Sequence, residues 1–202
     1  MKTIDFKKTH KDLYTATRKV KEVAVTKGTY LAVDGVGDPA GEAFHAAIQS
    51  LYTLAYTAKF TLKKQGVIDF GVPSLEALWP EADYQKLARA MWRWQLLLRI
   101  PDQVTAALLK PVRKSVLERK GLDARSVKRI AMAEGRCLQV LHVGRYDQVG
   151  AVYQALAAEA AARGLAPRRH GHEIYLSDPR RVAPERLKTI VRLPVARAAR
   201  KR

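Results

Sequence analysis

A short stretch near the end of the chain, Gly171–Pro179, carries the residues best suited to chemistry. It alternates polar and apolar residues and closes on Ser-Asp-Pro, which is typical of a strand followed by a turn. Because side chains alternate across a strand, Glu173 and Tyr175 share one face, and Ile174 and Leu176 share the other. A carboxyl and a phenol facing an aromatic interior would form a binding site, and catalysis is a further option. The alternative interpretation puts Glu173 at a solvated edge of the sheet.

Aromatic residues and a second glutamate could complete such a site. Glu76 lies in another segment, Ser74–Trp79, and we expect Glu76 and Glu173 to approach one pocket from two halves of the molecule. A carboxyl among aromatic rings loses hydration, so its pKa should rise toward neutrality. An ionised glutamate would attract cationic or hydrogen-bond-donating aromatic ligands, whereas one with a raised pKa could act as an acid or base. The side chains expected to wall the pocket are Tyr56, Trp79, Trp92, Trp94, Tyr146 and Tyr175.

Several common types of site are not indicated by the sequence. The five histidines form no i, i+4 pair with a glutamate between, and Gly35-x-Gly37 lacks the third glycine of a dinucleotide fingerprint. His170 and His172 on one strand could hold a metal, but neither a cysteine partner nor an obvious third ligand accompanies them. Cys137 is the only cysteine, which excludes an intrachain disulfide. We therefore expect neither a metal nor another cofactor.

The elements that would position Glu173 occur twice in the chain. We expect a strand at Tyr30–Val33, followed by a glycine turn and then by a helix with one apolar face. The same order recurs in residues 135–163. Five residues of the first unit match residues of the second at a single offset of 107, which indicates an internal duplication. The matching residues are Gly28, Leu31, Val33, Val36 and Gly37 in the first unit and Gly135, Leu138, Val140, Val143 and Gly144 in the second.

The segment between the two units predicts a strand and then a helix. Residues 92–100 alternate large apolar residues with arginine and glutamine, which is typical of a half-buried strand. Trp92 and Trp94 would emerge on one face of it, where core packing is the alternative to ligand contact. A polar helix kinked at Pro111 follows and ends at Gly121. We expect one domain, with a first half at about 22–100, a connector helix at about 101–121, a second half at about 127–195, and residues 1–21 along the surface.

The net charge of +18 suggests nucleic acid as a partner, but the distribution of the charge argues otherwise. Residues 28–100 hold seven basic and seven acidic residues, and residues 134–178 hold five of each. The excess lies in residues 1–27, 101–133 and 179–202, so we interpret it as a solvated basic surface. No apolar run approaches the roughly 18 residues of a membrane span, and the first residues lack the apolar core of a secretion signal. We expect a cytoplasmic monomer or homodimer.

Four segments resemble those of stand-alone GyrI-like small-molecule-binding proteins. Thr29–Pro39 and Leu51–Phe60 are similar to the opening of these proteins, and Leu75–Trp79 is similar to their Leu-Glu-Gly-Leu-Trp signature. The strongest similarity is in His172–Arg181, which the similar segment Pro184–Ile190 follows. The resemblance runs through nearly the whole chain in the expected order.

The resemblance implies an α+β fold with tandem β-α-β-β units around a pseudo-twofold axis. The units would form an antiparallel sheet with helices on one face and a ligand cleft between the halves. The same fold serves multidrug-sensing transcription activators, in which a buried glutamate at the position of Glu173 meets cationic drugs. Some stand-alone members are hydrolases that open the cyclopropane of DNA-alkylating toxins. The resemblance implies catalytic roles for Glu173 and Tyr175 and ligand contacts for Tyr56, Glu76, Trp79, Trp92, Trp94, Tyr146 and His172.

Three departures from the family pattern bear on the pocket. Ala77 stands where the family has glycine, Pro80 stands in place of a second tryptophan, and Gly171 separates His170 from His172. They leave the binding role intact and leave turnover open. The leading hypothesis is a protein that sequesters flat electrophilic aromatic toxins, with their hydrolysis as an open extension. The alternatives are a non-catalytic multidrug sensor or sequestering module and, less favoured, a nucleic-acid-binding protein.

Overall fold

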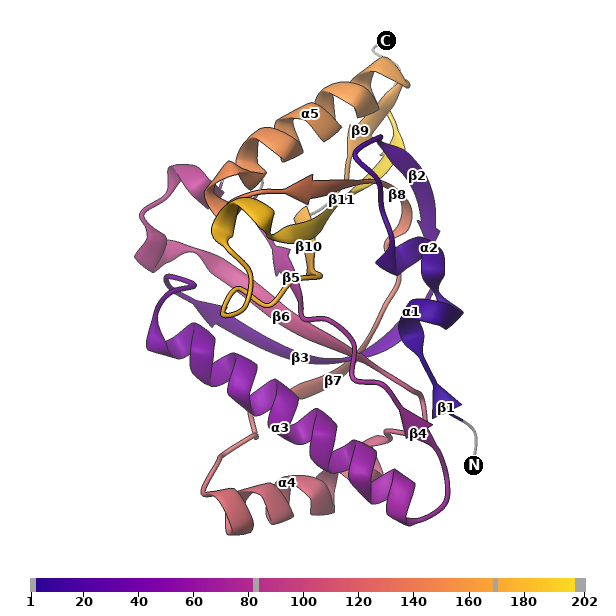
Figure 1. Cartoon of the computed structure of the whole chain (residues 1–202), viewed down its shortest axis with the longest axis vertical. Coiled ribbons are helices and arrows are strands. Elements are labelled where there is room, and N and C mark those ends of the chain that lie inside the picture. The colour runs from indigo at the N-terminus through magenta and orange to yellow at the C-terminus, as the bar shows by residue number, and fades with distance from the viewer. Residues whose placement is uncertain (1–2, 82–83, 169–170, 199–202) are drawn as a thin grey trace.

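One large antiparallel sheet runs through the molecule and joins its two halves (Figure 1). The computed structural model describes residues 3–81, 84–168 and 171–198. Nine strands form the sheet in the order β2-β8-β11-β10-β5-β6-β3-β7, with β9 paired to β11, while β1 and β4 pair separately. The strands are β1 Thr3–Ile4, β2 Lys21–Val25, β3 Gly28–Val36, β4 Asp69–Phe70, β5 Glu76–Trp79, β6 Arg93–Ile100, β7 Lys128–Met132, β8 Gly135–Val143, β9 Leu165–Pro167, β10 Gly171–Tyr175 and β11 Lys188–Arg197.

The strands repeat as the sequence predicts. β3 and β8 each span nine residues, and they begin 107 residues apart, as do β2 and β7. The order of the sheet is symmetric about its centre, where β5 pairs with β10. At the two edges the halves exchange partners, because β2 pairs with β8 and β7 pairs with β3. The predicted tandem units around a pseudo-twofold axis are therefore confirmed.

Two long helices cover one face of the sheet. α3, Glu42–Lys64, packs on β3 and β6 of the first half, and α5, Val149–Ala162, packs on β8 and β11 of the second half (Figure 1). Buried residues recur along α3 at helical spacing, among them Leu51, Leu54 and Ala58, which is why this helix settles on the sheet. In the second half Leu156 of α5 belongs to a core cluster with Val191 of β11. The predicted helices on one face are confirmed.

The N-terminal segment covers part of the opposite face. It forms two short helices, α1 Phe6–Thr9 and α2 Lys11–Tyr14, and buries Phe6, Leu13 and Tyr14. Residues 1–21 therefore do more than lie along the surface, because these three side chains enter the core. Its backbone carbonyls also accept hydrogen bonds from buried side chains of the sheet, since Arg192 donates to the carbonyl of Leu13. This segment thus closes a polar interior that the sequence does not reveal.

The connector helix is shorter than predicted. α4, Ala106–Lys120, begins five residues after Pro101 because Thr105 caps it, accepting a hydrogen bond from the backbone N–H of Leu108 at 3.2 Å. Its end agrees with the sequence, since Gly121 adopts the left-handed conformation with φ 62°. α4 packs against α3 rather than against the candidate site.

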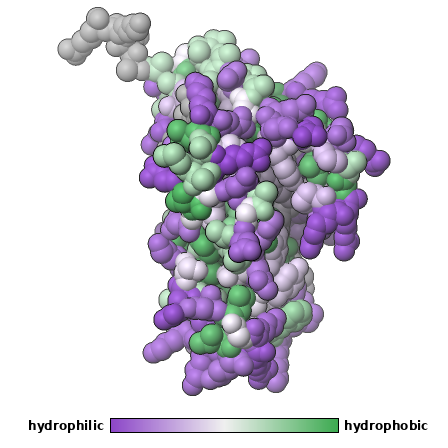
Figure 2. Space-filling view, turned by 90° about the vertical axis from the view of Figure 1, so that its left-hand side faces the viewer, coloured by the Kyte–Doolittle hydropathy of each residue, from purple (hydrophilic) through white to green (hydrophobic). Residues whose placement is uncertain are grey.

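In the described part of the chain no helix is both long and apolar enough to cross a membrane. The face shown in Figure 2 is mostly hydrophilic, with scattered hydrophobic side chains.

Candidate functional site

Glu173 lies at the centre of the sheet, on the face that α3 and α5 cover. β10 is flanked by β5 and β11, so its residues are remote from either edge, and only 2% of Glu173 is exposed. The hydroxyls of three tyrosines donate to its carboxyl group. Tyr84 and Tyr153 reach Oε1 at 3.2 and 3.5 Å, and Tyr175 reaches Oε2 at 3.0 Å. The alternative of a solvated carboxylate at the edge of the sheet is therefore excluded.

Burial dominates the ionisation of Glu173. It raises the pKa of the carboxyl group from 4.5 to about 7, and the tyrosine hydrogen bonds oppose this rise only in part. A carboxyl with this pKa exists in both protonation states near neutral pH. It can therefore accept a proton from a bound molecule or from water and return it later.

The hydroxyls around Glu173 stay protonated at ordinary pH. Burial, followed by the nearby charge of Glu173, raises the pKa of Tyr84, Tyr153 and Tyr175 well above 10 and that of Tyr146 to about 12. They are therefore neutral hydrogen-bond donors and not bases. The ring of Tyr146 meets that of Tyr175 edge to face, with 5.5 Å between centroids. The proton-accepting group in this cluster is consequently Glu173.

Three aromatic rings form a packed wall beside the carboxyl group. Tyr84 stacks on Trp79 with centroids 4.4 Å apart and an interplanar angle of 11°. Trp92 stands nearly perpendicular to both rings, with centroids 4.8 Å from Tyr84 and 5.9 Å from Trp79. Its indole N–H donates to the carbonyl of Leu87 at 3.0 Å, which fixes it to the segment that carries Tyr84. Trp79 and Trp92 thus lie where a ligand could stack near Glu173, and the ring of Tyr84 fills the space against them.

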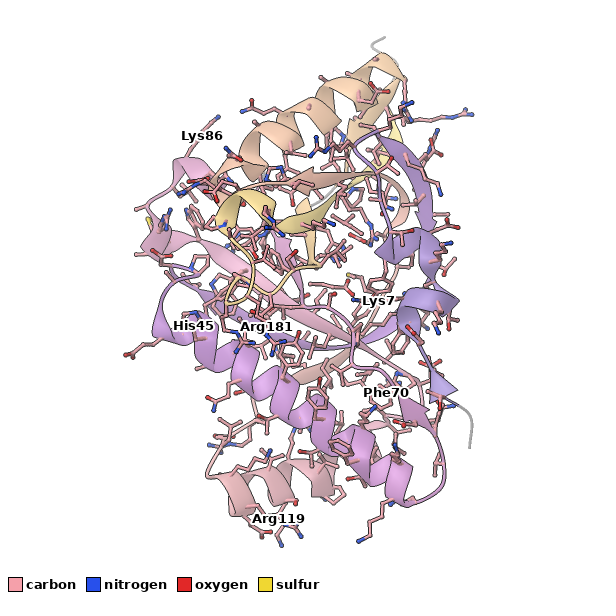
Figure 3. The ribbon with its side chains drawn as sticks, in the orientation of Figure 1. Lys7, His45, Phe70, Lys86, Arg119 and Arg181 are labelled. Carbon is pink, nitrogen blue, oxygen red and sulfur yellow. The ribbon has the colours of Figure 1, made fainter. Side chains whose placement is uncertain are left out.

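A loop brings Tyr84 to this place from a distant part of the chain. Tyr84 begins the one-turn 3₁₀ helix Tyr84–Lys86, and Figure 3 labels Lys86 on the loop beside the start of α5. Figure 3 also labels Arg181 on the loop that follows β10 and, in this view, lies between α5 and α3. Two surface hollows of about 400 and 510 Å³ lie elsewhere, and neither is lined by Glu173 or its tyrosine partners.

Comparison with known proteins agrees with the geometry. The model of the GyrI-like small molecule binding domain matches residues 112–196. A hydrolase from Listeria innocua is 39% identical, with a TM-score of 0.90 over 96% of this chain and 100% of that one. The chain belongs to the GyrI-like family. An uncharacterized conserved protein from the same organism is also 39% identical over 96% and 100% of the two chains, with a TM-score of 0.88.

More distant matches show only the shared GyrI-like fold. The C-terminal domain of EcmrR is 12% identical, with a TM-score of 0.57 over 89% of this chain and 98% of that one. No curated protein sequence matches the chain. The chain is thus a small-molecule-binding protein by family.

The prediction that Glu76 shares the pocket with Glu173 is wrong. Glu173 lies opposite Ala77 in the pairing of β10 with β5, so these two residues share a face and Glu76 projects from the other. A difference of one residue in register is enough to change the face. His172 lies on the same face as Glu76, for the same reason. Glu76 and His172 therefore do not face a ligand held against Glu173.

Glu76 and His172 belong instead to a buried ionic cluster. His172 lies between two carboxylates, with Nε2 2.9 Å from Oε2 of Glu76 and Nδ1 2.8 Å from Oε2 of Glu134. Burial lowers the pKa of His172, but the two carboxylates outweigh it and raise the pKa to about 9. Tyr14 donates to Glu76 at 2.7 Å, and Arg192 lies 3.3 Å from Glu134. This cluster fastens the N-terminal segment to the sheet.

Two other predicted contacts lie apart from Glu173. Trp94 packs edge to face on Phe44 at 5.0 Å and covers Gly35, so the alternative of core packing is correct for this tryptophan. Tyr56 is 44% exposed on α3, where its ring stacks between those of Tyr52 and Phe60. Neither donates a hydrogen bond to Glu173 within the described residues. The predicted residues that do gather around Glu173 are Tyr175, Tyr146, Trp79 and Trp92.

Two partners of Glu173 were not predicted. Tyr153 lies four residues after Val149, on the face of α5 that meets the sheet, so its helical spacing could have indicated it. Its phenol lies directly over Gly171, where an added Cβ would be 2.4 Å from the ring. Gly171, a departure from the family pattern, therefore makes room for Tyr153. Tyr84 lies in a segment without periodicity, and no local signal identifies it.

Within residues 3–81, 84–168 and 171–198, no three side chains of His, Cys, Asp and Glu are arranged to hold a metal ion. His170, considered as a partner of His172, lies outside the described residues. The side chain of His172 already bridges Glu76 and Glu134. Cys137 is buried, which raises the pKa of its thiol to about 12.

Proposed function

We propose that this protein binds flat, electrophilic aromatic toxins and adds water to them at Glu173. The observation that carries the proposal is a buried carboxyl group with a pKa of about 7, held by three tyrosine hydroxyls beside a wall of aromatic rings. Rings of this kind bind flat apolar molecules by stacking. The name hydrolase, given to a protein 39% identical to this one, supports an enzymatic role.

The proposed substrate carries a cyclopropane conjugated to a carbonyl group, as in toxins that alkylate DNA. Ionised Glu173 accepts a proton from water while the water oxygen forms a bond to a ring carbon. The ring carbon–carbon bond breaks, and its electron pair moves through the conjugated system onto the carbonyl oxygen. The hydroxyl of Tyr175 or Tyr146 stabilises that oxyanion. Glu173 then returns the proton to the oxygen, so that the net change is the addition of one water molecule.

The pKa values suit Glu173 to the role of base and the tyrosines to the role of hydrogen-bond donors. A base with a pKa of about 7 is largely ionised in a mildly alkaline cytoplasm and is still basic enough to accept a proton in the transition state. The tyrosines keep their protons and can therefore donate hydrogen bonds to the oxyanion. Opening the ring before it reaches DNA would protect the cell.

Mass spectrometry in heavy-oxygen water tests the reaction. The protein is incubated with a cyclopropane-bearing DNA alkylator, and the expected product is the ring-opened alcohol with one heavy oxygen atom. The matched control is Glu173→Gln, which keeps the shape of the side chain but removes the base. Ring opening no faster than in buffer alone would refute the hydrolytic role.

Sequestration without turnover is the second candidate. It is favoured by Ala77, which stands where the family pattern has glycine and so alters one wall of the site. Pro80 also stands where the family pattern has a second tryptophan. Tight binding of the intact alkylator, measured by quenching of tryptophan fluorescence, together with no alcohol product would select this role.

A further inference from the structure

The ring of Tyr84 makes every contact that a bound phenol would make at this site. It stacks on Trp79 at 4.4 Å, meets Trp92 edge to face at 4.8 Å, and donates its hydroxyl hydrogen to Glu173 at 3.2 Å. Only 4% of the residue is exposed. The side-chain amide of Gln85 donates to the same hydroxyl oxygen at 3.2 Å, so the phenol is held at both its face and its polar end.

A second observation shows that the occupant is imperfect. Trp79 is 3% exposed, and its indole N–H has no hydrogen-bond partner within the described residues. A buried donor left without an acceptor carries an energetic cost. Tyr84 cannot relieve this cost, because its hydroxyl group is engaged with Glu173 and Gln85. A ligand with an acceptor at another position on its ring system would do so.

We propose that Tyr84 is a built-in occupant of the ligand site, which the true ligand displaces. That ligand is a flat aromatic molecule with a hydroxyl or N–H donor for Glu173 and a separate acceptor for the indole N–H of Trp79. The inference rests on the proposed binding role of the Glu173 site but not on turnover there. Tyr84 thereby sets specificity, because molecules that lack the second polar group gain nothing over the phenol already present.

The need to displace Tyr84 should lower the apparent affinity of the protein for its ligand. If the site is free of Tyr84 in about 1–10% of molecules, the apparent affinity of the ligand is reduced by that fraction. Tyr84→Ala should then bind a flat aromatic ligand about 10- to 100-fold more tightly than the natural protein. The gain comes from the removal of an internal competitor, and no new contact is needed.

The test uses p-cresol, which is the side chain of tyrosine without its backbone, and toluene, which has the same shape without the hydroxyl group. We expect p-cresol at about five times its Kd to raise the Tm of Tyr84→Ala by about 2–4 °C. Toluene should raise it less at the same concentration, because it cannot donate to Glu173. Tyr84→Phe is the matched control, since it keeps the ring in place and should show no response to either compound.

The outcomes separate this inference from the proposed reaction. A folded Tyr84→Ala protein that p-cresol does not stabilise would overturn the inference, as would equal stabilisation by p-cresol and toluene. If Tyr84→Ala does not fold alone, refolding in p-cresol but not in toluene supports the inference, and failure in both overturns it. Binding of p-cresol without ring opening by the natural protein would leave Tyr84 as the occupant and remove the hydrolytic function.

Discussion

Two buried glutamates, Glu173 and Glu76, lie on neighbouring strands of one sheet, and their hydrogen-bond partners differ in charge. Glu173 accepts hydrogen bonds from three neutral tyrosines in the described part of the chain. Glu76 also accepts one from a tyrosine, Tyr14, but its second partner is His172, whose pKa of about 9 makes it a cation. A cation stabilises an ionised carboxylate and holds it in place. Neutral donors allow Glu173 to gain and lose a proton, which suits this residue for chemistry. The charged cluster around Glu76 suits a structural role.

Glu173→Gln gives the largest expected effect, and the effect is on activity. Removal of a general base should lower the rate of ring opening by about 10²–10⁴-fold, while the affinity for the intact toxin stays within a small factor. Single-turnover kinetics and a binding titration measure the two quantities. A variant with full activity would refute the assignment of Glu173 as the base.

His172→Gln should act on stability. Loss of the central cation removes the charge that bridges Glu76 and Glu134, which costs about 3–5 kcal/mol in the free energy of unfolding. Urea denaturation at pH 6 measures the change. His142→Gln is the control, because the imidazole of His142 donates one hydrogen bond at 3.0 Å to the carbonyl of Arg145, and its loss should cost only about 0.5–1.5 kcal/mol. Equal losses in the two variants would show that the cluster contributes no special stability.

The two regions should also differ in their dependence on pH. The pKa of Glu173 rises from 4.5 to about 7 on folding, so the folded protein binds more protons in that range and loses about 3 kcal/mol of stability as the pH rises through it. The pKa of His172 rises from 6.5 to about 9, so its stabilisation is complete below 6.5 and is lost as the pH rises through 9. Urea titrations across pH should show the lower step absent in Glu173→Gln and the upper step absent in His172→Gln.

Tyr175→Phe should have the smallest effect on the pH dependence of the reaction. It removes the hydrogen bond of 3.0 Å to Oε2 of Glu173, which favours the ionised carboxylate. The apparent pKa in the pH–rate profile should therefore move upward, by less than about 1. Tyr14→Phe removes the equivalent contact from Glu76 and should leave the profile unchanged. A shift of the same size in both variants would show that the two faces of the sheet are electrostatically coupled.

The fold could be predicted from the sequence because the duplication repeats residue types at a constant offset. Gly28 and Gly135 begin equivalent strands at the offset of 107, and the amphipathic spacing of α3 follows directly from its residue types. The position of Glu173 within a short alternating strand also indicates its burial. These are local signals, and the structure confirms them.

The composition of the site is less predictable because its parts come from distant segments. Tyr84 lies 89 residues before Glu173, in a stretch without periodicity, and only the folded sheet brings the two together. The error over Glu76 has a different cause. Glu173 pairs with Ala77, and the shift of one residue to Glu76 moves the side chain to the other face of the sheet. The four segments that meet around His172 are likewise separated by long stretches of chain.

The exchange of β2 and β7 between the halves has a consequence for how the protein holds together. The outermost strand of each half pairs with a strand of the other half, so neither half forms a complete sheet from its own residues. A half produced on its own would lack its terminal partner and could regain one only from a second copy. The chain therefore resembles a strand-swapped dimer whose two halves are covalently linked. The candidate site lies at the centre of the sheet, where β5 of one half pairs with β10 of the other.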